Sequence, residues 1–159
     1  MEQKLKKLAD KVLKFLCIGS KLEGINFYGL KILLSESEGN RDRIDGQIYI
    51  NIEGKFKVFD NEKFVLPRVE EDFPDYNWTE AYAEICKLRL KEIVDVRLGK
   101  EVPNLFVYFD SGEVLFIFGH HDKYESWQVG AWYNKYNNES WEVIACPGDN
   151  ICIGAPEDF

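Results

Sequence analysis

Apolar residues recur at three- and four-residue spacing in two segments of the chain. The first stripe consists of Leu5, Leu8, Ala9, Val12, Leu13 and Leu16. The second consists of Trp78, Ala81, Tyr82, Ile85 and Leu88. This spacing places the apolar residues on one face of a helix, so both segments are expected to be helices. Gly19 predicts the end of the first helix, and Asn77 with Glu80 forms a capping pair for the second.

The first helix has a basic polar face, which is also typical of helices that lie on membranes. Its apolar stripe carries no Trp, and the strands that follow need a cover. We therefore expect a core helix.

Strands are expected over most of the remaining chain, because apolar and polar residues alternate there. The expected strands are residues 30–34, 47–52, 55–59, 94–98, 105–109, 114–118, 127–132, 141–146 and 151–153. Glu53-Gly54 and Asp110-Ser111-Gly112 each predict a hairpin turn. Residues 105–109 and 114–118 are apolar at successive positions, which favours two strands covered on both faces.

These elements predict an α+β fold in which two helices pack on one or two mostly antiparallel sheets. The halves 1–70 and 77–159 follow the same order of helix, strand and hairpin, which suggests a degenerate duplication. Residues 61–77 are irregular, acidic and contain Pro67 and Pro74, so they are the best candidate boundary. Because 60–80 residues alone form a marginal core, we expect one compact domain over 1–159.

The charge is unevenly distributed along the chain. The 159 residues include 20 Lys and Arg against 28 Asp and Glu, a net charge of −8. Residues 1–100 are balanced, so residues 101–159 carry the whole excess. This excess disfavours nucleic acid and anionic membranes as partners and favours a basic protein. The chain has no 18-residue apolar run, no pattern typical of a secretory signal and no CxxC motif, so we expect a cytoplasmic protein with reduced cysteines.

His120-His121-Asp122, with Glu125 nearby, is the only sequence cluster of candidate metal ligands. Neighbouring side chains on a strand point to opposite faces, so a polar loop without metal is the preferred interpretation. The chain contains no GxSxG, P-loop, GxGxxG or HExxH motif. The sequence therefore nominates no catalytic residue, no metal site and no cofactor, and we expect a protein that is not an enzyme.

Aromatic and acidic residues are interleaved over residues 122–142. Trp and Tyr are favoured anchors of protein interfaces, and surrounding carboxylates add charge complementarity. The expected anchors are Trp127, Trp132 and Tyr136, and the acids expected to steer a basic partner are Asp110, Glu113, Asp122 and Glu125. The alternative for each aromatic residue is a place in the sheet core.

The segments FVYFDSGEVLFIFGHHDKYESWQV and WEVIACPGDNICIGAP, within about residues 104–156, carry a resemblance. Their Asp-Ser-Gly hairpin, the element Tyr124-Glu125-Ser126-Trp127 and the Pro147-Gly148 turn resemble immunity proteins of polymorphic-toxin and contact-dependent inhibition systems. The resemblance implies a cytoplasmic, non-enzymatic bacterial protein that binds and neutralises a cognate toxin. Several such toxins are basic nucleases, which would suit the acidic C-terminal part.

Two other functions stay open at this point. The first is a small-molecule-binding or regulatory domain with an aromatic pocket between helices and sheet. The second is a metal-dependent hydrolase that uses His120, His121 and Asp122. The sequence identifies neither the partner nor the oligomeric state.

Overall fold

The fold consists of two antiparallel sheets, two α-helices and one short 3₁₀-helix over the residues that the computed structural model describes, 3–132 and 138–159. The helices are α1 (Gln3–Cys17), η1 (Glu70–Asp72) and α2 (Trp78–Cys86). The six-stranded sheet has the order β1 (Leu22–Asn26), β2 (Leu30–Leu34), β3 (Gln47–Ile52), β8 (Trp127–Trp132), β9 (Glu142–Cys146) and β10 (Asn150–Gly154). The four-stranded sheet has the order β4 (Phe56–Phe59), β7 (Val114–Ile117), β6 (Leu105–Phe109) and β5 (Ile93–Leu98). The predicted α+β class is confirmed.

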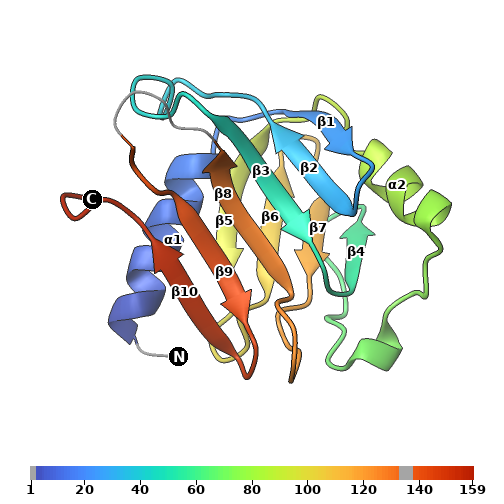
Figure 1. Ribbon diagram of the computed structural model, residues 1–159. Helices are drawn as coiled ribbons and strands as arrows, with labels where there is room; N and C mark the ends of the chain where they lie inside the picture. The colour runs from blue at the N-terminus through green and yellow to red at the C-terminus, as the bar shows by residue number, and fades with distance from the viewer. Residues whose placement is uncertain (1–2, 133–137) are drawn as a thin grey trace.

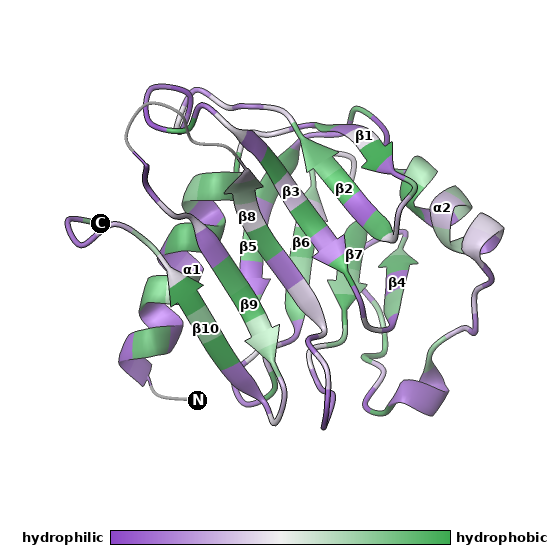
Figure 2. Cartoon of the chain, viewed as in Figure 1, coloured by the Kyte–Doolittle hydropathy of each residue, from purple (hydrophilic) through white to green (hydrophobic). Residues whose placement is uncertain are grey.

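The two sheets lie face to face, and the helices lie at opposite sides of the pair (Figure 1). α1 packs against β5 and against β8, β9 and β10, so it fills the space between the two sheets at that side. α2 lies beside β1, β2 and β4 (Figure 1). Apolar and polar residues alternate along several strands of the six-stranded sheet, as a sheet with one buried face requires (Figure 2).

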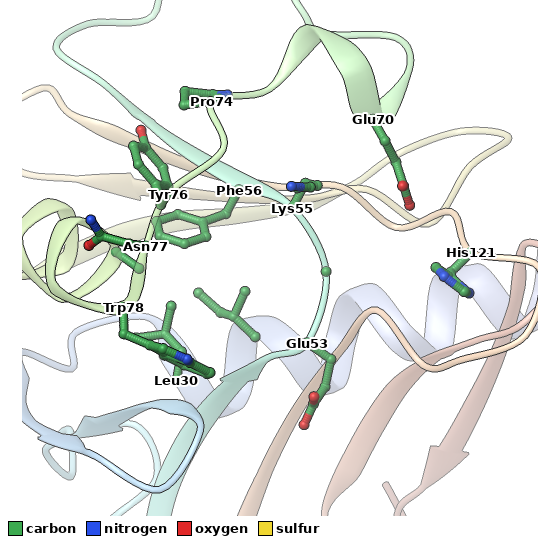
Figure 3. A pocket seen from close by; sticks show the side chains of 13 residues that line it. Leu30, Glu53, Lys55, Phe56, Glu70, Pro74, Tyr76, Asn77, Trp78 and His121 are labelled. Carbon is green, nitrogen blue, oxygen red and sulfur yellow. The ribbon is translucent and has the colours of Figure 1, made fainter.

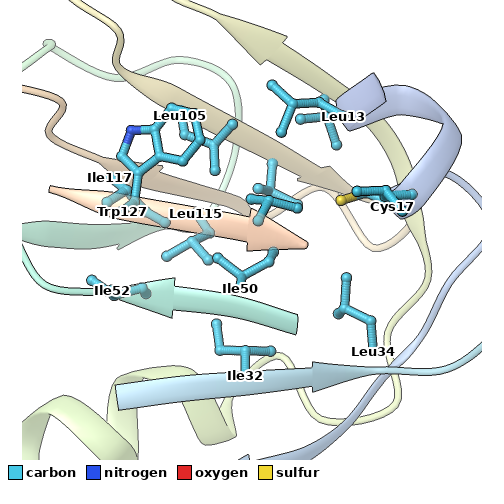
Figure 4. Close-up of a cluster of buried hydrophobic side chains, with 14 of the residues drawn as sticks. Leu13, Cys17, Ile32, Leu34, Ile50, Ile52, Leu105, Leu115, Ile117 and Trp127 are labelled. Carbon is cyan, nitrogen blue, oxygen red and sulfur yellow. The ribbon is translucent and has the colours of Figure 1, made fainter. Parts of the chain in front are cut away.

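The main core lies between the two sheets and includes residues of both helices. Leu105, Leu115 and Ile117 of the four-stranded sheet face Ile32, Ile50 and Trp127 of the six-stranded sheet (Figure 4). Leu13 and Cys17 of α1 close one side of this cluster (Figure 4). Burial of these side chains supplies the main favourable free energy of folding.

Both helices form where the sequence predicts them. The side chain of Asn77 accepts a hydrogen bond from the Glu80 backbone N–H at 2.9 Å and so caps α2. Gly19 has φ +84°, a left-handed conformation that suits the end of α1. Each predicted apolar stripe includes one residue that is exposed, because Leu8 is 36% and Trp78 is 64% exposed.

The two predicted hairpins have different outcomes. β6 and β7 pair with each other around Asp110-Ser111-Gly112, and they are the two middle strands of their sheet, as expected. The hairpin predicted at Glu53-Gly54 is wrong, because β3 pairs with β2 and β8 whereas β4 pairs with β7 in the other sheet. Glu53-Gly54 is therefore a crossover between sheets, and the two halves do not repeat the same strand pairing.

The irregular segment 61–77 covers the outer face of the four-stranded sheet. Phe73 packs against Phe116 and Phe118, with ring centroids 5.6 and 5.4 Å away, and Phe64 stacks on Phe59 at 4.1 Å. These contacts form a second, smaller apolar cluster. The segment is thus packed against the sheet instead of linking two separate halves.

Among the described residues, no helix is both long enough and apolar enough to cross a membrane.

Candidate functional site

Three adjoining hollows meet at one end of the pair of sheets. They have volumes of about 520, 800 and 580 Å³, and His121 lines all three. Most of the residues that line this region come from four segments, 53–56, 67–78, 119–126 and 147–149, which we call the loop end. The hollows are therefore parts of one continuous concave surface.

Backbone hydrogen bonds hold these segments together. The backbone N–H groups of Glu53 and Gly54 both donate to the Ser126 carbonyl, at 3.0 and 2.8 Å, and Gly148 N–H donates to the His121 carbonyl at 3.1 Å. A Cβ atom on Gly54 would lie 3.2 Å from the Phe118 carbonyl oxygen. The close approach of the 53–55 segment to the 119–126 segment thus favours glycine at position 54.

His120 lies between two carboxylates. Its Nδ1 is 2.7 Å from Asp149 Oδ1, and its Nε2 is 3.5 Å from Asp122 Oδ1. The hydrogen bond to Asp149 raises the pKa of His120, and the charges of Asp149, Asp122 and Glu70 raise it further against partial desolvation. The hydrogen bond between His120 and Asp149 therefore joins the 119–126 segment to the turn at 147–149.

His121 has a different environment. Its Nδ1 accepts hydrogen bonds from the backbone N–H groups of Lys123 at 3.0 Å and Tyr124 at 2.9 Å. In the neutral ring the proton must then be on Nε2, which leaves Nε2 as a donor. His120 bonds to Asp149, whereas His121 bonds to the backbone of its own loop, so the two rings are not arranged to bind one metal ion. Within the described residues, no group of three or more His, Cys, Asp or Glu side chains is arranged to hold a metal.

The 520 Å³ cavity lies between α2 and the ends of the two sheets. Leu30, Ile52, Phe56 and Ala81 are buried at its base. Tyr76 and Trp78 lie on the α2 side, while Glu53, Glu70 and His121 lie toward the other side (Figure 3). The cavity combines an apolar, partly aromatic wall with an acidic wall.

A group of exposed aromatic residues adjoins this cavity. The Trp78 ring stacks on Tyr82 at 5.9 Å, and Tyr82 packs edge-on against Phe27 at 5.0 Å. Tyr82 Oη lies 2.9 and 2.8 Å from the carbonyl oxygens of Phe27 and Gly29, which ties α2 to the β1–β2 turn. Phe27 is 77% and Tyr28 is 95% exposed. Exposed aromatic residues that adjoin a concave surface are typical of protein interfaces.

The loop end is strongly acidic. It contains the carboxylates Glu53, Glu70, Glu71, Asp72, Asp75, Asp122, Glu125 and Asp149, against the basic residues Lys55, Arg68 and Lys123. Lys55 is already engaged, because its Nζ lies 3.1 Å from Asp75 Oδ1. Over residues 3–132 and 138–159, no Lys or Arg forms an ion pair with Glu70, Asp122 or Glu125.

The four predicted steering acids do not form one patch. Asp122 and Glu125 lie in the loop end, where Glu125 accepts a hydrogen bond from Gln128. Asp110 and Glu113 lie at the opposite end of β7, whose four residues alone span about 13 Å. Glu113 is also neutralised by Lys91 and hydrogen-bonded by Ser111. The four acids expected to steer a basic partner therefore lie on two separate parts of the surface.

The three predicted anchors also separate. Trp127 has no exposed surface, and its Nε1 donates to the Pro103 carbonyl at 2.7 Å, so its assignment as an anchor is wrong. Trp132 is half-buried on the outer face of the six-stranded sheet, 4.6 Å from the Tyr49 ring and beneath the Lys31 ammonium. Tyr136 lies outside the described residues.

Several residues of the loop end were not predicted from the sequence. Glu53, Glu70, Tyr76 and Trp78 come from residues 1–100, whose charges balance overall. The acidic, proline-containing character of segment 61–77 was the available signal. Nothing local in the sequence indicates that this segment adjoins residues 119–126.

No protein-family model matches this chain, and no curated protein or solved structure matches it significantly.

Proposed function

We propose that this protein is a non-enzymatic binding module that recognises a basic protein through the loop end. The observation that carries the proposal is that three joined hollows lie at the same end of the molecule as Glu70, Asp122 and Glu125, which no Lys or Arg of the described residues neutralises. A concave acidic surface attracts a cationic partner at long range and then buries part of it.

The exposed aromatic residues support contact with a protein. Trp78 is 64% and Tyr124 is 68% exposed, and they line different hollows of the same surface. Large aromatic side chains that become desolvated at an interface contribute most of the binding free energy in many complexes. The loop end therefore offers both carboxylates that can attract a basic partner and aromatic residues that can anchor it.

The sequence resemblance gives this proposal its most specific form. Residues 104–156 resemble immunity proteins of toxin systems, so the proposed partner is a basic toxin or nuclease. Two of the resembling elements, Tyr124-Glu125-Ser126-Trp127 and the Pro147-Gly148 turn, contribute to the loop end. The proposed role is cytoplasmic neutralisation of that toxin by direct binding.

The experiment uses the product of the gene directly upstream of this coding sequence. Its expression alone should arrest bacterial growth, and co-expression with this protein should restore growth. The double variant Asp122→Lys/Glu125→Lys should lose protection, while Asp110→Lys, at the opposite end of β7, should retain it. Growth arrest that this protein does not relieve, or equal protection by both variants, would contradict the proposal.

The cavity beside α2 also favours the alternative of a small-molecule-binding domain. Its volume of about 520 Å³ is within the range of ligand pockets, and three aromatic residues line it. A rise in the thermal unfolding midpoint with a metabolite, in a protein that protects against no toxin, would support this alternative.

A further inference from the structure

The cavity beside α2 has two chemically different walls. Phe56, Tyr76 and Trp78 lie on one side, and Glu53 and Glu70 lie on the other (Figure 3). We propose that this cavity binds an arginine side chain of the basic partner, an inference that rests on the proposed function and specifies its central contact.

The apolar wall suits the methylene groups and the flat face of an arginine. The Phe56 and Tyr76 rings lie 5.3 Å apart, and Leu30 and Ile52 beneath them are almost fully buried. The Trp78 indole stacks on Tyr82 but keeps 64% of its surface exposed, and an exposed indole ring suits stacking on a guanidinium ion. Arginine carries an apolar stem and a planar cation, so it fits both parts of this wall.

The acidic wall suits the charge of the guanidinium group. Glu53 lines both the cavity and the 580 Å³ hollow, and a 2.8 Å hydrogen bond from Asn51 Nδ2 holds one of its carboxylate oxygens in place. Glu70 lies on the short helix η1 and lines both the cavity and the next hollow. Carboxylates bind guanidinium through paired charge-assisted hydrogen bonds.

The charges of the cavity favour a cation over an anion. Lys55 is the basic residue of the lining, and Asp75 already neutralises it at 3.1 Å. An anionic ligand would therefore face two carboxylates with no free positive charge among the lining residues. A cationic ligand meets Glu53 and Glu70 without that repulsion.

The connection between the hollows favours a protein side chain over a free metabolite. Glu53 and Gly54 line both the cavity and the 580 Å³ hollow, and Glu70 joins it to the 800 Å³ hollow. A polypeptide that covers this surface can place one side chain in the cavity and its neighbours in the adjoining hollows. An enclosed pocket would instead be expected for a small molecule.

The test titrates the full chain with Nα-acetyl-arginine amide and observes the indole N–H signal of Trp78 by NMR, assigned with Trp78→Phe. Nα-acetyl-citrulline amide is the matched control, because it has the same shape without the charge. The arginine probe should shift the Trp78 signal saturably, and the citrulline probe should bind about tenfold more weakly or less.

Two variants locate the site. Glu53→Gln/Glu70→Gln should weaken arginine binding by about tenfold. Glu38→Gln, whose side chain is 94% exposed at the opposite end of β2 and β3, should leave binding unchanged. An unshifted Trp78 signal, equal binding of the two probes, or unchanged binding by the double variant would each overturn the inference.

The same data separate this inference from the proposed function. Toxin neutralisation without arginine binding would refute only the arginine site and leave the binding module intact. Arginine binding without neutralisation of the upstream product would refute the proposed function and leave a site for cationic ligands.

Discussion

Trp127 and Trp78 have opposite environments, and this difference predicts their effects on stability. The Trp127 indole is fully enclosed and donates a hydrogen bond to Pro103, while Trp78 is 64% exposed. Trp127→Phe removes the hydrogen bond and leaves a buried carbonyl oxygen without its partner, so it should lower the free energy of unfolding by about 1–3 kcal/mol. Trp78→Phe should change it by about 0.5 kcal/mol or less.

Urea denaturation followed by far-UV circular dichroism measures both variants. Equal destabilisation by Trp127→Phe and Trp78→Phe would contradict the assignment of one residue to the core and the other to the surface.

His120 predicts a pH dependence of stability. Asp149 and Asp122 raise its pKa in the folded state above the ordinary value of 6.5. A raised pKa means that the charged form stabilises the fold, so this contribution is complete below pH 6.5 and is lost as the pH rises through the folded-state pKa. Solvent screening keeps the contribution small, because the side chain is 41% exposed.

The matching measurement compares thermal unfolding midpoints of wild type and His120→Gln at pH 5.5 and pH 8.5. The difference should be larger at pH 5.5. Asp149→Asn should lower the pKa of His120 in an NMR titration, and an unchanged pKa would contradict the role of Asp149.

At the scale of elements, the sequence predicted the helices, caps and hairpins that depend on residues close together in the chain. The stripe of α1, the Asn77 cap and the β6–β7 hairpin all follow from positions close in sequence. The pairing partners of β3 and β4 do not follow from nearby residues. A Gly-containing turn indicates that the chain bends, but it does not indicate which strand the next strand pairs with. β1 was missed because LEGIN lacks the alternation that identifies a half-buried strand.

The candidate site was only partly predictable for the same reason. Asp122 and Glu125, named from the sequence, lie in the loop end, but Glu53 and Glu70 reach this end only through the crossover between sheets and the packing of segment 61–77. The count of charged residues along the sequence assigned the acidic excess to residues 101–159. The fold instead combines acids from both halves at one end and pairs Glu113 with Lys91.

The N-terminus of α2 is the element that positions Trp78 at the cavity. Asn77→Ala removes the cap and should cost about 1 kcal/mol in the free energy of unfolding. It should also weaken binding of the arginine probe, because Trp78 directly follows the cap. Asn77→Ser retains a capping oxygen and should keep both stability and binding. Urea denaturation and the NMR titration measure the two effects, and intact stability in Asn77→Ala would contradict the capping role.

At the scale of the whole molecule, one end of the pair of sheets differs from the other. The loop end collects eight carboxylates, the three joined hollows and two exposed aromatic residues. The opposite end also carries acids, among them Asp110, Glu113 and Glu38, but Lys91 pairs with Glu113 and Arg41 pairs with Glu38. The excess of carboxylates over basic residues at the loop end is expected to orient a cationic partner before contact.

The most direct test of this asymmetry is an ¹H–¹⁵N NMR titration of the protein with a deca-arginine peptide at low and high salt. We expect the backbone shifts to concentrate in residues 53–56, 68–78 and 119–126 at low salt and to shrink as added salt screens the charges. Shifts that are strongest around the Asp110–Glu113 turn, or that are spread evenly over both ends of the molecule, would contradict it.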